Sequence, residues 1–350
     1  MSPELLRIID ANFNRSREAL RVMEEYARFV LNDARSTAML KSIRHELTQI
    51  ICGLLPAEQL LASRDTPADV GTTLSTASEK KRDDAAAVFI AAARRLGESL
   101  RALEEYGKVI DPGLGERIET WRYHTYEIEK KLAFAGGRHE LMRRARLYVL
   151  VTDSLCAGDW LETIRQVAQA GAHVVQLREK QLDDGELLRR ACAAVEVCRT
   201  HDTLFIMNDR PDLARLCQAD GVHVGQDDLP VSSVRRIVGP DVLVGTSTHD
   251  PQQLAQAIDQ DPDYVAVGPM FATETKPQDR IAGPEFLAHA AQATELPLVA
   301  IGGINTDNLG RLNPPRPCCL AVCAAIIAKP DPAKAVADLL EQLDASAPPE

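Results

Sequence analysis

The sequence has no long hydrophobic run, and no apolar stretch approaches the roughly 18 residues that a membrane-spanning helix needs. The first ten residues carry a charge every few positions and contain no apolar core of the signal-peptide type. We therefore expect a cytoplasmic protein that does not cross a membrane.

An excess of positive charge is also missing. The chain has 40 lysines and arginines against 51 aspartates and glutamates, which gives a formal net charge of −11. Proteins that bind polyanions non-specifically usually present a basic face, so we do not expect nucleic acid as a partner. A small phosphorylated ligand stays compatible with this charge, because a few local cations are enough to bind it.

The cysteines lack the spacing of a metal site. The chain contains 8 cysteines, and no CxxC pair is followed by a second pair. Most of them lie within apolar runs, where we expect small buried thiols. A disulfide framework is not expected in a chain of 350 residues with a sizeable apolar core.

Residues 1–135 have little glycine or proline, and their apolar residues recur at helical spacing. The predicted stripe consists of Ile9, Phe13, Leu20, Met23, Tyr26, Ala27 and Val30. Residues 91–106 repeat residues 11–26 with about half of the positions identical, so we predict two related helices in one helical bundle. Gly136-Gly137 is interpreted as the joint between a helical domain, residues 1–139, and a second domain, residues 140–350.

After this joint, short apolar runs alternate with helical stretches such as 159–170, 183–199 and 284–293. The runs are 147–151, 174–177, 204–207, 222–224, 242–244, 264–267, 298–301 and 320–327. Alternating strands and helices indicate a parallel sheet, and about eight units favour a closed (β/α)8 TIM barrel. An open, doubly wound parallel sheet is the alternative.

Polar residues follow six consecutive apolar runs, at the end of the barrel where active sites lie. The segments are Gln176–Lys180, Asn208–Arg210, Gly225–Asp228, Gly245–His249, Gly268–Lys276 and Gly302–Gly303. Each segment alone is typical of a turn or a helix cap. Together they supply the cations Arg178, Lys180 and Lys276 and the carboxylates Asp209 and Asp228. This combination suits a polyphosphate held through a divalent metal such as Mg²⁺, which typically takes one or two protein carboxylates plus phosphate oxygens and water.

These segments, read as QLREK, NDR, GVHVGQDD, GTSTH, GPMFATETK and AIGGI, resemble thiamine-phosphate synthases over roughly residues 146–345. The resemblance implies a role in thiamine biosynthesis. The implied reaction joins 4-amino-5-hydroxymethyl-2-methylpyrimidine diphosphate to 4-methyl-5-(2-phosphoethyl)thiazole, and it releases thiamine phosphate and diphosphate.

The resemblance also implies roles for individual residues. It assigns Lys276, Arg178 and Lys180 to catalysis and Asp209 and Asp228 to magnesium. The implied substrate-binding residues are Gln176, Leu177, Arg178, Glu179, Lys180, Asn208, Ser247, Thr273, Glu274, Thr275, Lys276, Gly303, Cys323 and Ala324. The pair Cys323-Ala324 departs from the Val-Ser of the family, so a serine hydroxyl contact to the thiazole phosphate is lost.

The N-terminal half resembles a helical domain found fused to this synthase, which is similar to a hydroxymethylpyrimidine-phosphate kinase. The resemblance rests on segments 9–24, 40–47 and 63–71, and it implies ATP as a substrate. A polar cluster suits phosphate binding; its members are Asn12, Asn14, Arg15, Arg17, Arg21, Arg44, His45, Arg64 and Asp65. The alternative is a non-catalytic helical module for assembly or regulation.

Other interpretations of the barrel remain open on the residues alone. An isomerase would need a general acid and a general base on facing strands, and Asp209 and Asp228 could imitate such a pair. Cys156 or Cys323 could act as a nucleophile, although the implied reaction needs none. We expect small-molecule substrates, and the sequence leaves a homo-oligomer open.

Overall fold

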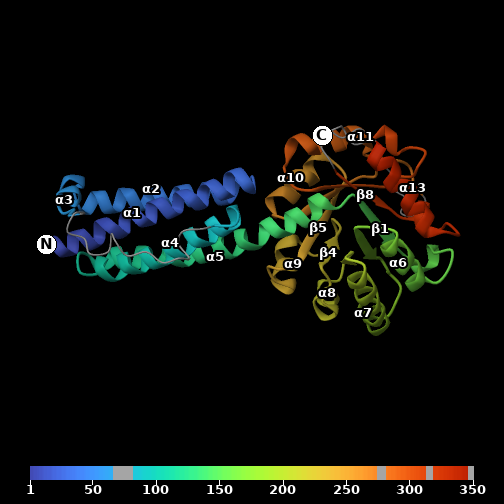
Figure 1. The fold of residues 1–350 in the computed structure, drawn as a ribbon, viewed down its shortest axis with the longest axis horizontal. Helices are drawn as coiled ribbons and strands as arrows, with labels where there is room; N and C mark the ends of the chain where they lie inside the picture. Colours follow the sequence, from blue (N-terminus) through green and yellow to red (C-terminus); the bar gives the residue numbers. More distant parts are fainter. Residues whose placement is uncertain (66–81, 274–280, 313–317, 346–350) are drawn as a thin grey trace. The chain divides into compact units, whose positions relative to one another are not determined.

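The computed structural model describes residues 1–65, 82–273, 281–312 and 318–345. The chain divides into two compact units, Met1–Gly136 and Gly137–Glu350 (Figure 1). This division lies three residues before the predicted domain boundary at 139/140. Each unit is described separately below.

The first unit is helical, as predicted. Its elements are α1 (Pro3–Glu25), the π-helical turn η1 (Tyr26–Val30), α2 (Ala34–Leu54), α3 (Ala57–Ala62), α4 (Ala85–Gly107) and the first part of α5 (Pro112–Arg144). The predicted apolar stripe is buried except for Val30, which is 41% exposed. The wider π-helical turn shifts the helical phase, so the expectation for Val30 was wrong.

The repeated sequence produces a repeated arrangement of charges. In α1, the buried Glu24 accepts hydrogen bonds from Arg21, three residues earlier, and from Arg44 of α2. In α4, the buried Glu104 accepts them from Arg101, again three residues earlier, and from Arg122 of α5. The hairpins α1–α2 and α4–α5 are therefore two copies of one structural unit.

Helix α5 continues through Gly136-Gly137 without a break, so the pair does not form a loop. A Cβ atom on Gly136 would lie 2.8 Å from the hydroxyl oxygen of Tyr26. The glycine is therefore explained by close packing. Glycine costs a helix only about 1 kcal/mol relative to alanine.

The second unit is an eight-stranded parallel barrel that closes in sequence order from β1 to β8, as predicted. The strands are β1 (Leu147–Val151), β2 (Val174–Leu177), β3 (Leu204–Asn208), β4 (Gly221–Val224), β5 (Leu243–Thr248), β6 (Tyr264–Val267), β7 (Leu298–Ile301) and β8 (Cys319–Val322). The pairing of β1 with β8, with Leu147 opposite Leu320, closes the sheet.

Helices surround the barrel (Figure 1). They are η3 (Asp153–Leu155), α6 (Trp160–Gln169), α7 (Asp184–Thr200), α8 (Pro211–Cys217), α9 (Val231–Val238), α10 (Pro251–Asp259), α11 (Gly283–Ala293), η4 (Leu309–Arg311), α12 (Ala324–Ile327) and α13 (Pro332–Ala345). The predicted strand 320–327 was too long, because Cys323 leaves the extended conformation, with ψ −101°, and α12 begins after it.

Side chains alternate between the two faces of each strand. Leu147, Val149 and Val151 of β1 pack in the layer between sheet and helices, whereas Tyr148 and Leu150 face the barrel interior. Residues that come directly after the strands, and whose side chains point inward, can therefore lie close together at the carboxyl end of the barrel.

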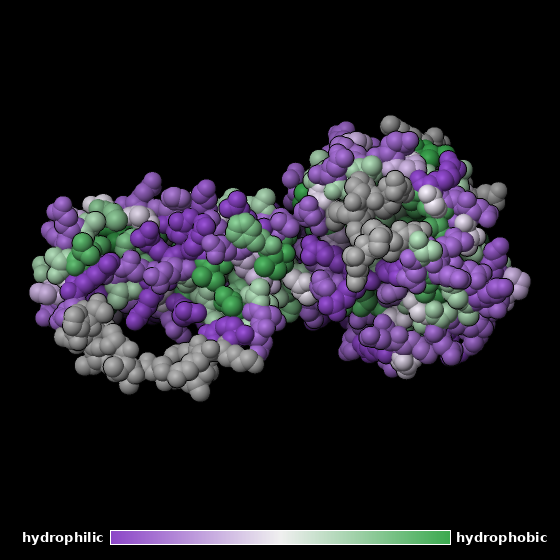
Figure 2. All heavy atoms as spheres, turned by 45° about the horizontal axis from the view of Figure 1, so that its top comes forward, coloured by the Kyte–Doolittle hydropathy of each residue, from purple (hydrophilic) through white to green (hydrophobic). Residues whose placement is uncertain are grey.

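The surface of the helical unit is mostly hydrophilic, with exposed hydrophobic residues among the polar ones (Figure 2). Phe29, Leu61 and Val109 are each more than 60% exposed. None of the helices in the described ranges combines the length and the hydropathy needed to cross a bilayer.

Candidate active site

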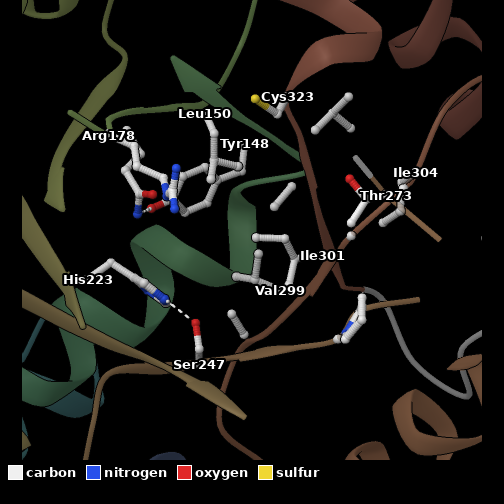
Figure 3. Close-up of a pocket in the computed structure, with 18 of the residues that line it drawn as sticks. Tyr148, Leu150, Arg178, His223, Ser247, Thr273, Val299, Ile301, Ile304 and Cys323 are labelled. Carbon is white, nitrogen blue, oxygen red and sulfur yellow. Dashed lines mark hydrogen bonds between the residues drawn. The ribbon is translucent and has the colours of Figure 1, made fainter. Parts of the chain in front are cut away.

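A cavity of about 380 Å³ opens at the carboxyl ends of the strands. Residues on or just after all eight strands line it, and Figure 3 shows Arg178, Ser247, Thr273 and Cys323 around it. The described site residues that line it are Gln176, Arg178, Lys180, Asn208, Asp209, Asp228, Ser247, Thr273, Gly303, Cys323 and Ala324. The structure thus brings together predicted residues from all strands except β1.

Two of the predicted substrate-binding residues lie outside the cavity. Leu177 packs in the layer between sheet and helices. The carboxylate of Glu179 accepts a hydrogen bond from the backbone N–H of Asp153 at 2.6 Å. The QLREK segment was assigned as one block, whereas its even-numbered residues line the cavity and its odd-numbered ones do not. Glu274, Thr275 and Lys276 lie outside the described residues.

The two predicted magnesium ligands, here called the acidic pair (Asp209 and Asp228), lie close together. Burial raises the pKa of the Asp209 carboxyl, and the neighbouring carboxyl of Asp228 raises it further. Asp209 adopts a left-handed backbone conformation, with φ +60°, at the end of β3. Such a conformation is strained for a residue with a side chain, and it turns Asp209 into the cavity.

The acidic pair also has well-defined partners. The ammonium group of Lys180 lies 3.1 Å from the Asp209 carboxylate, and the Asp228 carboxylate accepts the backbone N–H of Gly225 at 2.7 Å. No cluster of three or more potential metal ligands occurs within the described ranges. Two carboxylates are nevertheless enough for Mg²⁺, which takes its remaining ligands from phosphate oxygens and water. The residues present therefore fit a magnesium ion that binds together with a phosphorylated ligand.

Arg178 supplies a further positive charge in the same cavity as the acidic pair. Its guanidinium group forms no ion pair with a carboxylate of the described residues, and the side chain lines the cavity (Figure 3). Its backbone is fixed instead, since its N–H donates to Val151 and its carbonyl accepts the hydroxyl of Thr152. The charge of Arg178 is therefore available to an anionic ligand.

Another part of the cavity wall consists of two backbone segments in close contact, Gly302-Gly303 after β7 and Phe271–Thr273 after β6. Gly302 and Gly303 follow β7 with φ +101° and +68°. A Cβ atom on Gly303 would lie 2.4 Å from the carbonyl oxygen of Ala272, and the N–H of Phe271 donates to the carbonyl of Gly302 at 2.9 Å. Only glycine allows the segment with Thr273 to approach β7 so closely.

Sequence reasoning missed three polar residues in the barrel interior, Tyr148, His223 and Tyr264, although the segments around them were identified. Hydrogen bonds link these residues to one another and to Gln176 and Ser247. The signal available in the sequence was Gly245, because a glycine in a strand often marks a close approach by another group. In the structure, a Cβ atom on Gly245 would lie 2.0 Å from the ring of Tyr264, so the glycine makes room for a large interior side chain.

The thiol of Cys156 is unsuited to nucleophilic attack, because burial raises its pKa to about 11. Cys323 and Ala324 both line the cavity, at the junction of β8 and the short helix α12.

In the helical unit, the predicted phosphate-binding arginines have carboxylate partners. Arg21 and Arg44 bind Glu24, and Arg64 makes two hydrogen bonds to the buried Asp10. Asn14 also donates to Asp10. These partners offset the charge that a phosphate would need. A phosphate that binds Arg21, Arg44 or Arg64 would have to compete with these carboxylates, and the phosphate site at these arginines stays a prediction.

Arg17 differs from these arginines. Its guanidinium carbon lies 5.3 Å from the centre of the Phe13 ring. Among the described residues it forms no ion pair, and its buried Nε atom has no hydrogen-bond partner. The exposed Arg15 also has no ion pair with the described residues, so Arg15 and Arg17 are the arginines of the predicted cluster whose charge is not offset there.

A parallel barrel with cations, an acidic pair and glycine-rich backbone around one cavity defines a (β/α)8-barrel enzyme for phosphorylated substrates. The family model described as thiamine monophosphate synthase matches residues 147–326, and the model described as ThiD2 family matches residues 7–131. The chain belongs to the thiamine-phosphate synthase family.

Similar proteins extend this finding over the whole chain. A thiamine-phosphate synthase from Synechocystis sp. is 39% identical over 341 residues, which cover 97% of this chain and 96% of that protein. One from Rhodopirellula baltica is 43% identical over 317 residues, or 88% of this chain and 84% of that protein. The solved structure of a thiamine phosphate pyrophosphorylase from Pyrococcus furiosus is 28% identical with a TM-score of 0.53, and covers 59% of this chain and 98% of its own.

Proposed function

We propose that the barrel condenses 4-amino-5-hydroxymethyl-2-methylpyrimidine diphosphate with 4-methyl-5-(2-phosphoethyl)thiazole to give thiamine phosphate and diphosphate. The observation that carries this proposal is one cavity that holds the acidic pair, with Lys180 next to it, and a further cation, Arg178. This arrangement suits a diphosphate that departs with its charge offset. The cavity also has a separate, glycine-rich side that suits a second phosphate.

The chemistry needs no nucleophile from the protein. The bond between the exocyclic methylene carbon and the diphosphate oxygen breaks, and its electron pair leaves with the diphosphate. The lone pair of the thiazole nitrogen then forms the new carbon–nitrogen bond. The electron-rich aminopyrimidine stabilises the positive charge on the methylene carbon between these steps.

The residues of the chain have distinct roles in this proposal. Arg178 and Lys180 stabilise the charge that grows on the departing diphosphate, and Lys276 is assigned the same role by the family resemblance. Asp209 and Asp228 would hold a magnesium ion, which offsets diphosphate charge when it is bound. Gln176, Asn208 and Ser247 orient the pyrimidine diphosphate, while Thr273, Gly303 and the backbone at Cys323-Ala324 hold the thiazole phosphate.

A product assay tests this proposal. The full chain, supplied with both substrates and Mg²⁺, should form thiamine phosphate and diphosphate in equal amounts. Arg178→Ala should lower the rate about 10²-fold, because one fixed charge at a developing anion is worth a few kcal/mol. An unchanged rate in this variant would remove Arg178 from the mechanism.

We further propose that the helical unit phosphorylates the pyrimidine monophosphate with ATP, and so makes the substrate of the barrel. The match of residues 7–131 to the ThiD2 family supports this proposal, as does Arg17, whose Nε atom has no hydrogen-bond partner among the described residues. The competing proposal, a non-catalytic assembly or regulatory module, is favoured by the arginines bound to carboxylates. The ADP released by the full-length Asp209→Ala variant, with and without pyrimidine monophosphate, distinguishes the two.

A further inference from the structure

Five side chains from five strands form one hydrogen-bond chain across the barrel interior. Gln176 Nε2 donates to Tyr148 Oη at 2.8 Å, and Tyr148 Oη lies 3.2 Å from Tyr264 Oη. Tyr264 Oη lies 3.0 Å from His223 Nδ1, and His223 Nε2 lies 2.8 Å from Ser247 Oγ. We call this series the interior chain.

The interior chain connects two residues assigned to the substrate. Gln176 and Ser247 are its ends and line the cavity, and Figure 3 shows the contact of His223 with Ser247. The middle members are buried: Tyr148 is 2% exposed, Tyr264 0% and His223 7%. Burial raises the pKa of both tyrosines, so they stay protonated and each has one hydrogen to donate.

The direction that we assign to the hydrogen bonds starts at the Gln176 end. Tyr148 accepts from the Gln176 amide, and its one hydroxyl hydrogen is then assigned to Tyr264, the other polar side chain bonded to it. Tyr264 then donates to His223 Nδ1. A neutral histidine that accepts at Nδ1 carries its proton at Nε2, and it therefore donates to Ser247 Oγ.

We propose that the interior chain fixes the hydrogen-bonding roles of the two residues at its ends. Ser247 accepts from His223, so its hydroxyl hydrogen points to the ligand and Ser247 acts as a donor to the diphosphate. Gln176 donates one amide N–H to Tyr148, which fixes the orientation of the amide. Its carbonyl oxygen and its second N–H are left for the pyrimidine, and the oxygen accepts from an amino group there. Tyr264, His223 and Tyr148 are positioning residues for the synthase reaction.

The packing gives this arrangement a single geometry. The Tyr264 ring stacks on His223 with centroids 5.5 Å apart, and Gly245 leaves the space that the ring occupies. The tyrosine hydroxyl can therefore reach Nδ1 with little freedom to choose another partner. Preorganised hydrogen bonds of this kind need no rearrangement when charge develops on the ligand.

The first test is the histidine tautomer, which is independent of the proposed substrates. In protein labelled with [15N]histidine, the His223 signals, assigned with His223→Gln, should show a proton on Nε2 and none on Nδ1. Tyr264→Phe should populate both tautomers, because Nδ1 loses its donor. Tyr148→Phe should keep the wild-type tautomer, because Tyr264 still donates. A proton on Nδ1 in the wild type, or an unchanged tautomer in Tyr264→Phe, would overturn the proposal.

The second test is kinetic and rests on the proposed substrates. Tyr264→Phe should lower kcat/KM for the pyrimidine diphosphate about tenfold, as expected for one misdirected hydrogen bond to a charged group. In a Ser247→Ala background, the same change should lower it less than about twofold, because the two residues act as one unit. The KM for thiazole phosphate should not change.

Matched controls separate this role from loss of structure. Tyr106→Phe removes the hydroxyl of a tyrosine that is 42% exposed in the helical unit, and it should leave both readouts unchanged. If Tyr264→Phe lowered kcat/KM by the same factor in the wild-type and Ser247→Ala backgrounds, the tyrosine would only support the fold. That result would refute the positioning role. If no variant makes product but the tautomer results hold, the substrate assignment fails and the interior chain stands.

Discussion

Arg138 donates a hydrogen bond from Nε to the Asp263 carboxylate at 2.6 Å, and the two side chains are only 9% and 2% exposed. Arg138 lies near the end of α5, and Asp263 directly precedes β6. Arg235 and the backbone N–H of Val244 also bind this carboxylate. The end of α5 is thus attached to the barrel by a buried ion pair.

Arg138→Ala should destabilise the barrel unit by about 2–3 kcal/mol, somewhat less than the loss of one partner from an isolated buried ion pair, because Arg235 remains. Urea unfolding, monitored by the fluorescence of Trp160, measures this loss of stability. The measurement uses a Trp121→Phe background, so that the signal comes from the barrel unit alone. Arg144→Ala is the matched control and should barely shift the midpoint, since Arg144 is 77% exposed and its ion pair with Glu140 lies at the surface. Equal effects of the two variants would contradict the importance of the buried pair.

The ion pair also bears on how the two units can be separated. The sequence predicts that a fragment of residues 140–350 is soluble and makes thiamine phosphate from supplied pyrimidine diphosphate. Because that fragment lacks Arg138, we expect it to unfold at lower urea than a fragment of residues 137–350. Identical unfolding midpoints would show that the end of α5 adds nothing to the barrel.

Asp209→Ala and Asp228→Ala should each lower synthase turnover on the order of 10²–10³-fold with the fold retained, because each removes a carboxylate that faces the diphosphate. Asp227→Ala is the control, since this exposed residue does not line the cavity. Turnover measured over a range of Mg²⁺ concentrations checks the result. A wild-type rate at limiting Mg²⁺ in either variant would exclude the acidic pair as the metal site.

Lys276→Ala should mainly lower kcat, whereas Thr273→Ala should mainly raise the KM for thiazole phosphate. The charge of the departing diphosphate grows in the transition state, while the thiazole phosphate keeps its charge throughout. Steady-state kinetics with each substrate varied in turn separates the two effects. The reverse pattern would exchange the two phosphate sites.

The kinase proposal depends on Arg17. Arg17→Ala should lower the ADP release that depends on pyrimidine monophosphate about tenfold or more, because it removes a charge-assisted hydrogen bond to phosphate. Arg28→Ala, which removes an exposed arginine stacked on Phe29, should not lower it. Substrate-dependent ADP release that is absent from the folded, unsubstituted chain would favour the non-catalytic module.

Hydrophobic periodicity was enough to predict the helical unit and the eight strands, because both depend on burying one face. It failed at residues 324–327, where Ala-Ala-Ile-Ile is apolar enough for a strand but forms a helix after the backbone turns at Cys323. Single-sequence patterns also could not foresee that Arg21 and Arg44 share Glu24, since arginine near glutamate on a helix is equally typical of a solvated face. The interior chain was missed because its polar residues satisfy one another only after the barrel closes.

The central claim is that the barrel cavity joins the two substrates with loss of diphosphate. Phosphorus NMR of the full chain with supplied pyrimidine diphosphate, thiazole phosphate and Mg²⁺ tests it most directly. The account predicts that thiamine phosphate and diphosphate appear at equal rates, and that both rates fall together in Asp209→Ala. Release of diphosphate from the pyrimidine diphosphate without formation of thiamine phosphate would contradict it. So would the absence of any reaction by the folded chain at saturating substrates.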